Sequence, residues 1–205
     1  MGYRLVPLLL LLVAGLEACG KEIGDSCSLS TDCSPNNDRL CIDPPGTPNS
    51  TWNGYCTIQG CDYSTCPEEA ACVRFFTGSF SNKTCDRACD LVYGPQNLLC
   101  PAPVPPQVQC SLDEHCAVDD KCVARSSEIR YCMRTCDSDG DCRDGYECRD
   151  LDKMISDGGE PVLADGQVID TDGQVIDLTQ KGEDGKPKVV APHPPKFCAV
   201  KPASP

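Results

Sequence analysis

The stretch "GYCTIQGCDYSTCPEEAACVRFF", Gly54 to Phe76, carries four cysteines and two phenylalanines in one short segment. The whole chain of 205 residues holds 19 cysteines, while aromatic residues make up only 5 % of it. Cysteine at this density is typical of scaffolds in which covalent loops replace a large apolar core. We therefore expect a small disulfide-rich fold, built of tandem cysteine-rich modules with short β-hairpins and little helix outside the N-terminal segment.

The cysteines fall into four groups of four with similar spacing. These groups are Cys27, Cys33, Cys41 and Cys56; Cys61, Cys66, Cys72 and Cys85; Cys110, Cys116, Cys122 and Cys132; and Cys136, Cys142, Cys148 and Cys198, with Cys89 and Cys100 left between the second and third. Three groups end on an aromatic residue followed by cysteine, whereas Cys85 follows Thr84. Each group allows three pairings, and bridges between neighbouring groups are equally open. One aromatic ring over the disulfides would give each module a minimal core.

Metal binding and redox chemistry fit this spacing poorly. Zinc sites, iron–sulfur sites and thioredoxin-like motifs usually bring two cysteines together as C-x2-C, a spacing that this chain lacks. Histidine ligands are also scarce, since His115 and His193 are the only two. We expect structural disulfides and no cofactor.

The N-terminus predicts secretion. One basic residue, Arg4, precedes the apolar run Leu5 to Leu16, which is shorter than the roughly 20 residues of a membrane-spanning helix. The sequence Leu16-Glu17-Ala18-Cys19 then resembles a bacterial lipobox, although Glu17 departs from the small or apolar residue usual there. We expect a lipoprotein signal peptide at 1–18 and lipid, including palmitate, on Cys19. An even number of cysteines then remains for disulfides.

Composition shifts divide the mature chain into two regions. The first spans 19–100 and contains two four-cysteine units with Cys89 and Cys100; a proline-rich linker follows at 101–109. The second region spans 110–198, and a short tail occupies 199–205. Its insert, 149–197, contains three Asp-Gly turn signals between short β-prone runs at 162–164, 167–170, 174–178 and 188–191. This pattern predicts a small antiparallel meander.

Charge and composition limit the partners. The formal net charge of −13 disfavours nucleic-acid binding, which requires a basic face. Aromatic residues on cysteine-bounded loops, Phe75, Phe76, Phe80 and Trp52, are candidate contacts for a protein or surface partner, with the local module core as the alternative. The partner itself is not specified by the sequence.

Neither calcium binding nor catalysis finds a complete motif. Asp170, Asp172 and Asp177 resemble part of a calcium loop, but Val175 stands where an EF-hand needs glycine and no glutamate follows at the twelfth position. His115 has Asp113 and Glu114 beside it as possible hydrogen-bond partners, yet no hydrolase or metalloprotease motif surrounds it. We expect a protein that is not an enzyme.

The lipobox, the repeated C-x5-C-x5-C spacing and the phrases "EIGDSCSLSTDCSP" and "GYCTIQGCDYSTCPEEAACVRFF" together resemble the myxobacterial type of cysteine-rich outer-membrane lipoprotein. The spacing alone is also similar to Dickkopf-type cysteine-rich domains. The lipoprotein resemblance implies secretion and periplasmic or surface exposure on the outer membrane, without an assigned activity. The function expected is adhesion, scaffolding or envelope assembly by contact. The alternatives are a soluble secreted module of inhibitor or ligand type and a calcium-dependent surface protein.

Overall fold

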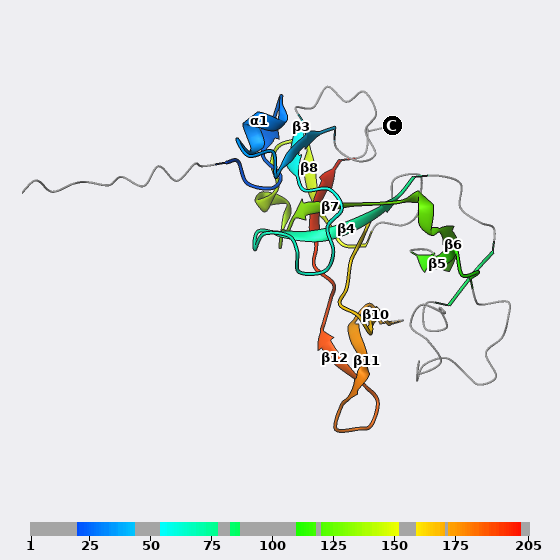
Figure 1. The fold of residues 1–205 in the computed structure, drawn as a ribbon. Coiled ribbons are helices and arrows are strands. Elements are labelled where there is room, and N and C mark those ends of the chain that lie inside the picture. The colour runs from blue at the N-terminus through cyan, green and yellow to red at the C-terminus, as the bar shows by residue number, and fades with distance from the viewer. Residues whose placement is uncertain are drawn as a thin grey trace, which may run out of the picture.

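The computed structural model describes residues 20–43, 54–77, 83–86, 110–117, 120–151, 159–170 and 172–201. Within these ranges the regular structure is mostly short strands, with one four-residue α-helix, α1 (Ser30–Cys33), and two short 3-10 helices, η5 (Arg125–Ser127) and η6 (Asp139–Asp141), as Figure 1 shows in part. The strands are β1 (Ser26–Cys27), β2 (Leu40–Ile42), β3 (Gly54–Thr57), β4 (Ala70–Phe76), β5 (Glu114–Ala117), β6 (Lys121–Ala124), β7 (Glu128–Arg134), β8 (Tyr146–Arg149), β9 (Gly159–Pro161), β10 (Gln167–Ile169), β11 (Val175–Lys181), β12 (Pro187–Ala191) and β13 (Phe197–Val200). The small disulfide-rich fold expected from composition is confirmed.

Eight disulfides join the sixteen cysteines of the described residues, and all follow one rule. In each set of four cysteines the first pairs with the third and the second with the fourth. The bridges are Cys27–Cys41 and Cys33–Cys56; Cys61–Cys72 and Cys66–Cys132; Cys136–Cys148 and Cys142–Cys198; and Cys85–Cys116 and Cys110–Cys122. Cys19, Cys89 and Cys100 lie outside the described residues. We call each such set a crossed module.

The third and fourth cysteines of every crossed module face each other across two antiparallel strands. Cys41 is opposite Cys56 in β2–β3, and Cys72 is opposite Cys132 in β4–β7. The same register places Cys148 opposite Cys198 and Cys116 opposite Cys122. Neighbouring cysteines on adjacent strands therefore never bond to each other; each bonds back to the loop before the strands.

This register corrects the grouping expected from spacing. Cys85 does not close the second module, because Cys66 pairs with Cys132 across a sequence separation of 66 residues. The first, second and third modules therefore end at Cys56, Cys132 and Cys198, and each ends on an aromatic residue followed by cysteine. The fourth set, which we call the nested module, lies inside the second. Thr84-Cys85 breaks the aromatic rule because Cys85 is the first cysteine of its module.

The loop between the first two cysteines is closed by one acidic side chain in two of the modules. Asp32 Oδ2 accepts hydrogen bonds from the backbone N–H groups of Ser28 and Leu29, at 2.8 and 3.0 Å. Asp141 Oδ2 does the same for Asp137 and Ser138, at 3.0 and 2.9 Å. These bonds lower the pKa of both carboxyl groups. The repeated "x-Asp-Cys" ending of these loops therefore has a structural purpose.

The two regions predicted on either side of the 101–109 segment are tightly joined. The linker itself lies outside the described residues. However, β4 from the first region pairs with β7 and β9 from the second in one sheet of order β7-β4-β9. The bridges Cys66–Cys132 and Cys85–Cys116 also connect the two regions. The central sheet is shared by both.

The core consists of disulfides and of one cluster of aromatic rings, which lies where the first, second and third modules meet. Tyr55 and Phe197, each preceding a fourth cysteine, are fully buried, and Tyr131 packs against the same cluster. Tyr55 stacks on Tyr146 with ring centroids 5.6 Å apart, which joins the first module to the third. Phe75 meets Phe197 edge to face at 6.3 Å, which joins the second to the third.

Gly159 allows β9 to lie against this core. A Cβ atom at this position would stand 2.8 Å from Phe75 Cε1 and 2.9 Å from Phe197 Cζ, closer than carbon atoms normally approach. Any side chain would therefore push β9 away from β4 or disturb both rings.

The predicted meander is confirmed, with one difference. Strands β10, β11 and β12 form an antiparallel sheet in that order, which stands apart from the other strands in Figure 1 and has a small core of Val168, Ile176 and Leu178. The expected strand at 162–164 does not form. Instead β9 immediately before it pairs with β4, and Val162 continues this pairing by donating its N–H to the carbonyl of Cys72 at 2.8 Å.

The crossed connectivity predicts unequal contributions of the bridges to stability. Replacing Cys66 and Cys132 together by alanine opens a loop of sequence separation 66, whereas replacing Cys110 and Cys122 opens one of 12. Loop-closure entropy gives losses of about 4 and about 3 kcal/mol respectively. Guanidinium unfolding of the two double variants measures the difference. Disulfide mapping of the native chain is expected to recover a Cys66–Cys132 peptide; a Cys66–Cys85 peptide would contradict this fold.

Candidate functional site

The long inserts of the second and third modules meet around one cavity. We call residues 73–131, between Cys72 and Cys132, the second insert, and residues 149–197, between Cys148 and Cys198, the third insert. The cavity has a volume of about 570 Å³, within the range of small-molecule sites. Its lining comes from both inserts and from residues 59–62, around the first cysteine of the second module: Gln59, Gly60, Asp62, Arg74, His115, Cys116, Arg125, Glu128, Ile129, Arg130, Glu160, Pro161, Val162, Leu163, Ala164, Asp165, Val168 and Ile169.

The third insert supplies the apolar side of the cavity. Its chain leaves β9 at Pro161 and reaches β10 through Val162, Leu163 and Ala164, all in the lining. Val168 of β10 is buried and belongs also to the small core of the meander. Because pairing with β4 at one end and the meander at the other hold this segment, its apolar side chains keep their place along the cavity.

The second insert supplies a charged side that is largely buried. Arg74 of β4 donates through Nη2 to Glu160 Oε1 of β9 at 2.6 Å, and only 14 % of the Arg74 side chain and 4 % of the Glu160 side chain are exposed. The two residues face each other in the β4–β9 register. A pair this deeply buried has compensated charges, but either partner alone would be costly.

His115 of β5 extends this cluster toward the nested module. Arg74 Nη1 lies 3.4 Å from its Nδ1, so that nitrogen accepts and the neutral ring carries its proton on Nε2. Nε2 lies 3.1 Å from Glu128 Oε2, but it is buried and makes no well-aligned hydrogen bond. Burial and then the charge of Arg74 lower the pKa of His115 to about 4, against the opposing effect of Glu128.

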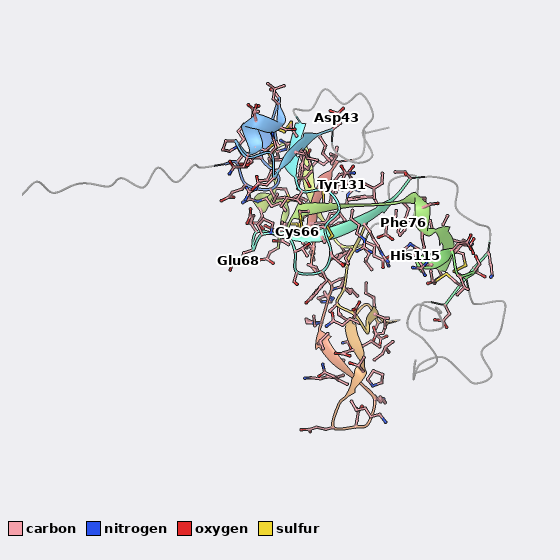
Figure 2. The ribbon with its side chains drawn as sticks, viewed as in Figure 1. Asp43, Cys66, Glu68, Phe76, His115 and Tyr131 are labelled. Carbon is pink, nitrogen blue, oxygen red and sulfur yellow. A yellow bond between two sulfur atoms is a disulfide. The ribbon has the colours of Figure 1, made fainter. Side chains whose placement is uncertain are left out.

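Phe76 fixes the other side of the His115 ring. The two rings meet edge to face with centroids 5.2 Å apart, and Figure 2 shows them together where β4 reaches the β5–β6 hairpin. Phe76 also packs with Ala117 and Val123 of that hairpin. The nested module is therefore attached to the central sheet by one apolar contact and one charged cluster.

The charges become more exposed toward the opening. Glu128 pairs through Oε1 with Arg130 Nε, and Arg130 Nη1 donates to Asp62 Oδ1 at 2.8 Å. The exposed fraction of the side chains rises from 11 % at Glu128 through 32 % at Arg130 to 72 % at Asp62. Glu128, Arg130 and Asp62 thus form a continuous chain of ion pairs that runs from the buried end of the cavity to its rim.

Two further charged residues stand at the rim, one from each insert. Arg125 donates Nε to the carbonyl of Leu112 at 3.2 Å, and among the described residues its guanidinium enters no ion pair. Asp165 lies in the turn before β10, and its carboxylate has no partner among the described residues. The rim therefore offers one cation and one anion without an ion-pair partner in the part of the chain that the structure describes.

The aromatic contacts predicted from the sequence are corrected. Phe75 and Phe76 are only 5 % and 1 % exposed, so both belong to the core and neither presents a contact surface. They are buried because both faces of β4 are covered: Phe75 packs against Phe197 and Tyr131, and Phe76 packs against the β5–β6 hairpin. Trp52 and Phe80 lie outside the described residues.

The calcium candidates do not converge. Asp170 Oδ1 accepts hydrogen bonds from the N–H groups of Asp172 and Gln174, which closes a turn. Asp177 accepts from the Thr179 N–H and hydroxyl and from the Gln180 amide. Within the described ranges, potential ligand atoms gather in threes only around disulfide cysteines.

Sequence reasoning missed the charged cluster because its members are far apart in the chain. Glu114, an expected partner of His115, instead accepts from the Ser111 N–H and hydroxyl, at 3.1 and 2.7 Å. The true neighbours, Arg74 and Glu128, lie on other strands. The only local signal is a charged residue within the otherwise apolar stretch "CVRFF".

Removing one partner of the buried pair tests its importance for folding. Glu160→Ala would leave the charge of Arg74 buried without the carboxylate that compensates it. We therefore expect the free energy of unfolding to fall by about 3–5 kcal/mol. Glu22→Ala is the matched control, because the Glu22–Arg134 pair is 3.0 Å long but 62 % of the Glu22 side chain is exposed. Its expected loss is about 0–1 kcal/mol. Equal losses in denaturant unfolding would contradict the buried charge cluster.

The lowered pKa of His115 predicts acid sensitivity. The unfolded chain binds a proton near the ordinary pKa of 6.5, whereas the folded protein resists it until about 4. The contribution of neutral His115 to the free energy of unfolding is therefore fully present above pH 6.5. It is lost as the pH falls from 6.5 to about 4, by about 3 kcal/mol. His115→Gln should lose less stability over the same window. An NMR titration that placed the His115 midpoint near 6.5 would rule this out.

Comparison with known proteins adds no assignment to these observations. The chain matches no protein-family model, no curated protein and no solved structure. Within the described residues, no helix is both long and apolar enough to cross a membrane.

Proposed function

We propose that this chain is a lipid-anchored protein of the bacterial outer membrane that binds a partner by contact and performs no catalysis. The observation that carries the proposal is the convergence of two inserts, from separate crossed modules, on one cavity. Segments held by a rigid scaffold are the usual position of binding residues. Here the scaffold is covalent, because both ends of each insert are fixed by disulfide-bonded cysteines on paired strands.

Contact is favoured over chemistry by the residue types around the cavity. The lining residues include no serine, threonine, lysine or tyrosine, and Cys116 is bonded to Cys85. His115 already receives Arg74 at Nδ1 and has a pKa lowered to about 4, which makes it a weak base at neutral pH. No activated nucleophile is available within this lining.

The anchor is supported by the lipobox sequence at Leu16 to Cys19. Gly20, the next residue, already packs against the first module: a Cβ atom there would lie 2.7 Å from the Cys33 carbonyl oxygen. Ile23 is fully buried in the core. A lipid on Cys19 would thus hold the first module directly at the membrane surface. Its acyl chains would contribute about 0.8 kcal/mol per buried methylene.

Metabolic labelling tests the anchor. The full chain expressed in a bacterial host is expected to incorporate radiolabelled palmitate and to fractionate with the outer membrane. Cys19→Ala should lose both properties, because the sulfur that carries the lipid is gone. Lys21→Ala, two residues further on, is the matched control and should keep both.

A soluble secreted module is the competing function, and the same experiment separates the two. An unlabelled wild-type protein that accumulates in the medium would reject the anchor and favour the secreted ligand or inhibitor. The crossed modules and the cavity would be unchanged in that case.

A further inference from the structure

We propose that the cavity binds a small zwitterion with an apolar side chain, an amino acid or a short peptide with both ends free. The inference deepens the contact function proposed above and rests on it. It names the class of ligand from the three kinds of group that line the cavity: an uncompensated cation, an uncompensated anion and an apolar wall.

The charged groups of the cavity divide into compensated and uncompensated sets. Arg74 is paired with Glu160, and Arg130 is paired with Glu128 and Asp62. Bringing an additional charge to these pairs would compete with bonds that already exist. Arg125 and Asp165 are different, since neither has an ion-pair partner among the described residues. They are the charges still able to bind a ligand.

Both free charges line the same cavity, and they are of opposite sign, as are the two ends of a zwitterion. Arg125 comes from the second insert and Asp165 from the third, and the cavity lies between these segments. The bond from Arg125 Nε to the Leu112 carbonyl holds the base of the guanidinium and leaves its Nη groups for a carboxylate. The carboxylate of Asp165 is an acceptor for an ammonium group. A ligand of a single sign would leave one of the two without a partner.

The interior of the cavity selects an apolar side chain of limited size. Leu163, Val168 and Ile169 line the cavity on the third insert, and a volume of about 570 Å³ accommodates a dipeptide but not a folded partner. A volume of this size leaves room for a second residue beside the first, which favours a short peptide over a free amino acid.

The probes are the dipeptide Leu-Leu, its N-acetyl form, its C-terminal amide and free leucine. Each is titrated into the folded, fully oxidised protein and followed by amide NMR shifts. We expect saturable shifts at the cavity with Leu-Leu and about tenfold weaker binding when either end is blocked, since each block removes one charge-assisted contact. The leucine titration tells a peptide from an amino acid: weaker binding than Leu-Leu supports a peptide, and equal binding supports an amino acid.

Two variants assign the ends. Arg125→Gln should weaken Leu-Leu binding about tenfold and remove the difference between Leu-Leu and its amide. Asp165→Asn should weaken it similarly and remove the difference between Leu-Leu and its N-acetyl form. Lys181→Gln and Asp172→Asn, exposed residues of the meander outside the cavity lining, are the matched controls and should bind Leu-Leu as the native chain does.

The proposal is overturned if no probe shifts the cavity resonances, or if all forms of Leu-Leu bind equally. Arg125 and Asp165 are exposed, so we expect native-like amide spectra for both variants. A variant with such a spectrum that fails to bind has lost the site and not the fold. The palmitate experiment does not depend on the cavity. Palmitate labelling without dipeptide binding would reject the ligand alone. Dipeptide binding without palmitate labelling would reject the anchor alone.

Discussion

The crossed pair of disulfides over two antiparallel strands is the constraint on which the rest of this protein depends. With aromatic residues at 5 % of the sequence, apolar burial alone is a weak source of stability for such short strands. The first and second cysteines of each module bind the third and fourth, which face each other across the ladder. One loop is thereby fixed to both strands, and the rings Tyr55 and Phe197 pack with the cysteines of the second and third modules. Strand register and loop position are set together.

This constraint leaves one segment of each module free to vary in length. The chain between the third and fourth cysteines enters and leaves at facing positions of a ladder, so its length does not affect the closure of the module. In the first module it is short, between Cys41 and Cys56. In the second it contains the nested module, and in the third it contains β9 and the meander. Because β9 returns to pair with β4, the two long inserts are brought to the same place.

The sequence predicted the fold class and the meander. It also contained the signal that marks the end of a module, an aromatic residue before the last cysteine, although spacing alone led to another grouping. Tyr55, Tyr131 and Phe197 mark the fourth cysteines, and the exception at Thr84 shows that Cys85 opens a module. Regular spacing placed Cys85 at the end of the group that begins at Cys61, because spacing depends on loop length and carries no information on strand register. The charged cluster was beyond sequence reasoning: Arg74, His115 and Glu160 are neighbours only because three strands from distant parts of the chain converge. Phe75 and Phe76 looked like contacts because nothing local shows that the third module covers one face of β4 and the nested module the other.

The buried charges are unusual in a protein with so little apolar core, and their position suggests why they are kept. The nested module meets the central sheet through Phe76 and through the ring of His115, between Arg74 and Glu128. An apolar contact alone is tolerant of rotation, whereas hydrogen bonds to a planar ring and a guanidinium define direction. Directed contacts at this junction fix the nested module on the central sheet, and the Arg74–Glu160 pair joins that sheet to the third insert, so together they define the shape of the cavity. Burying these groups therefore serves to define the geometry of the binding site more than to stabilise the fold.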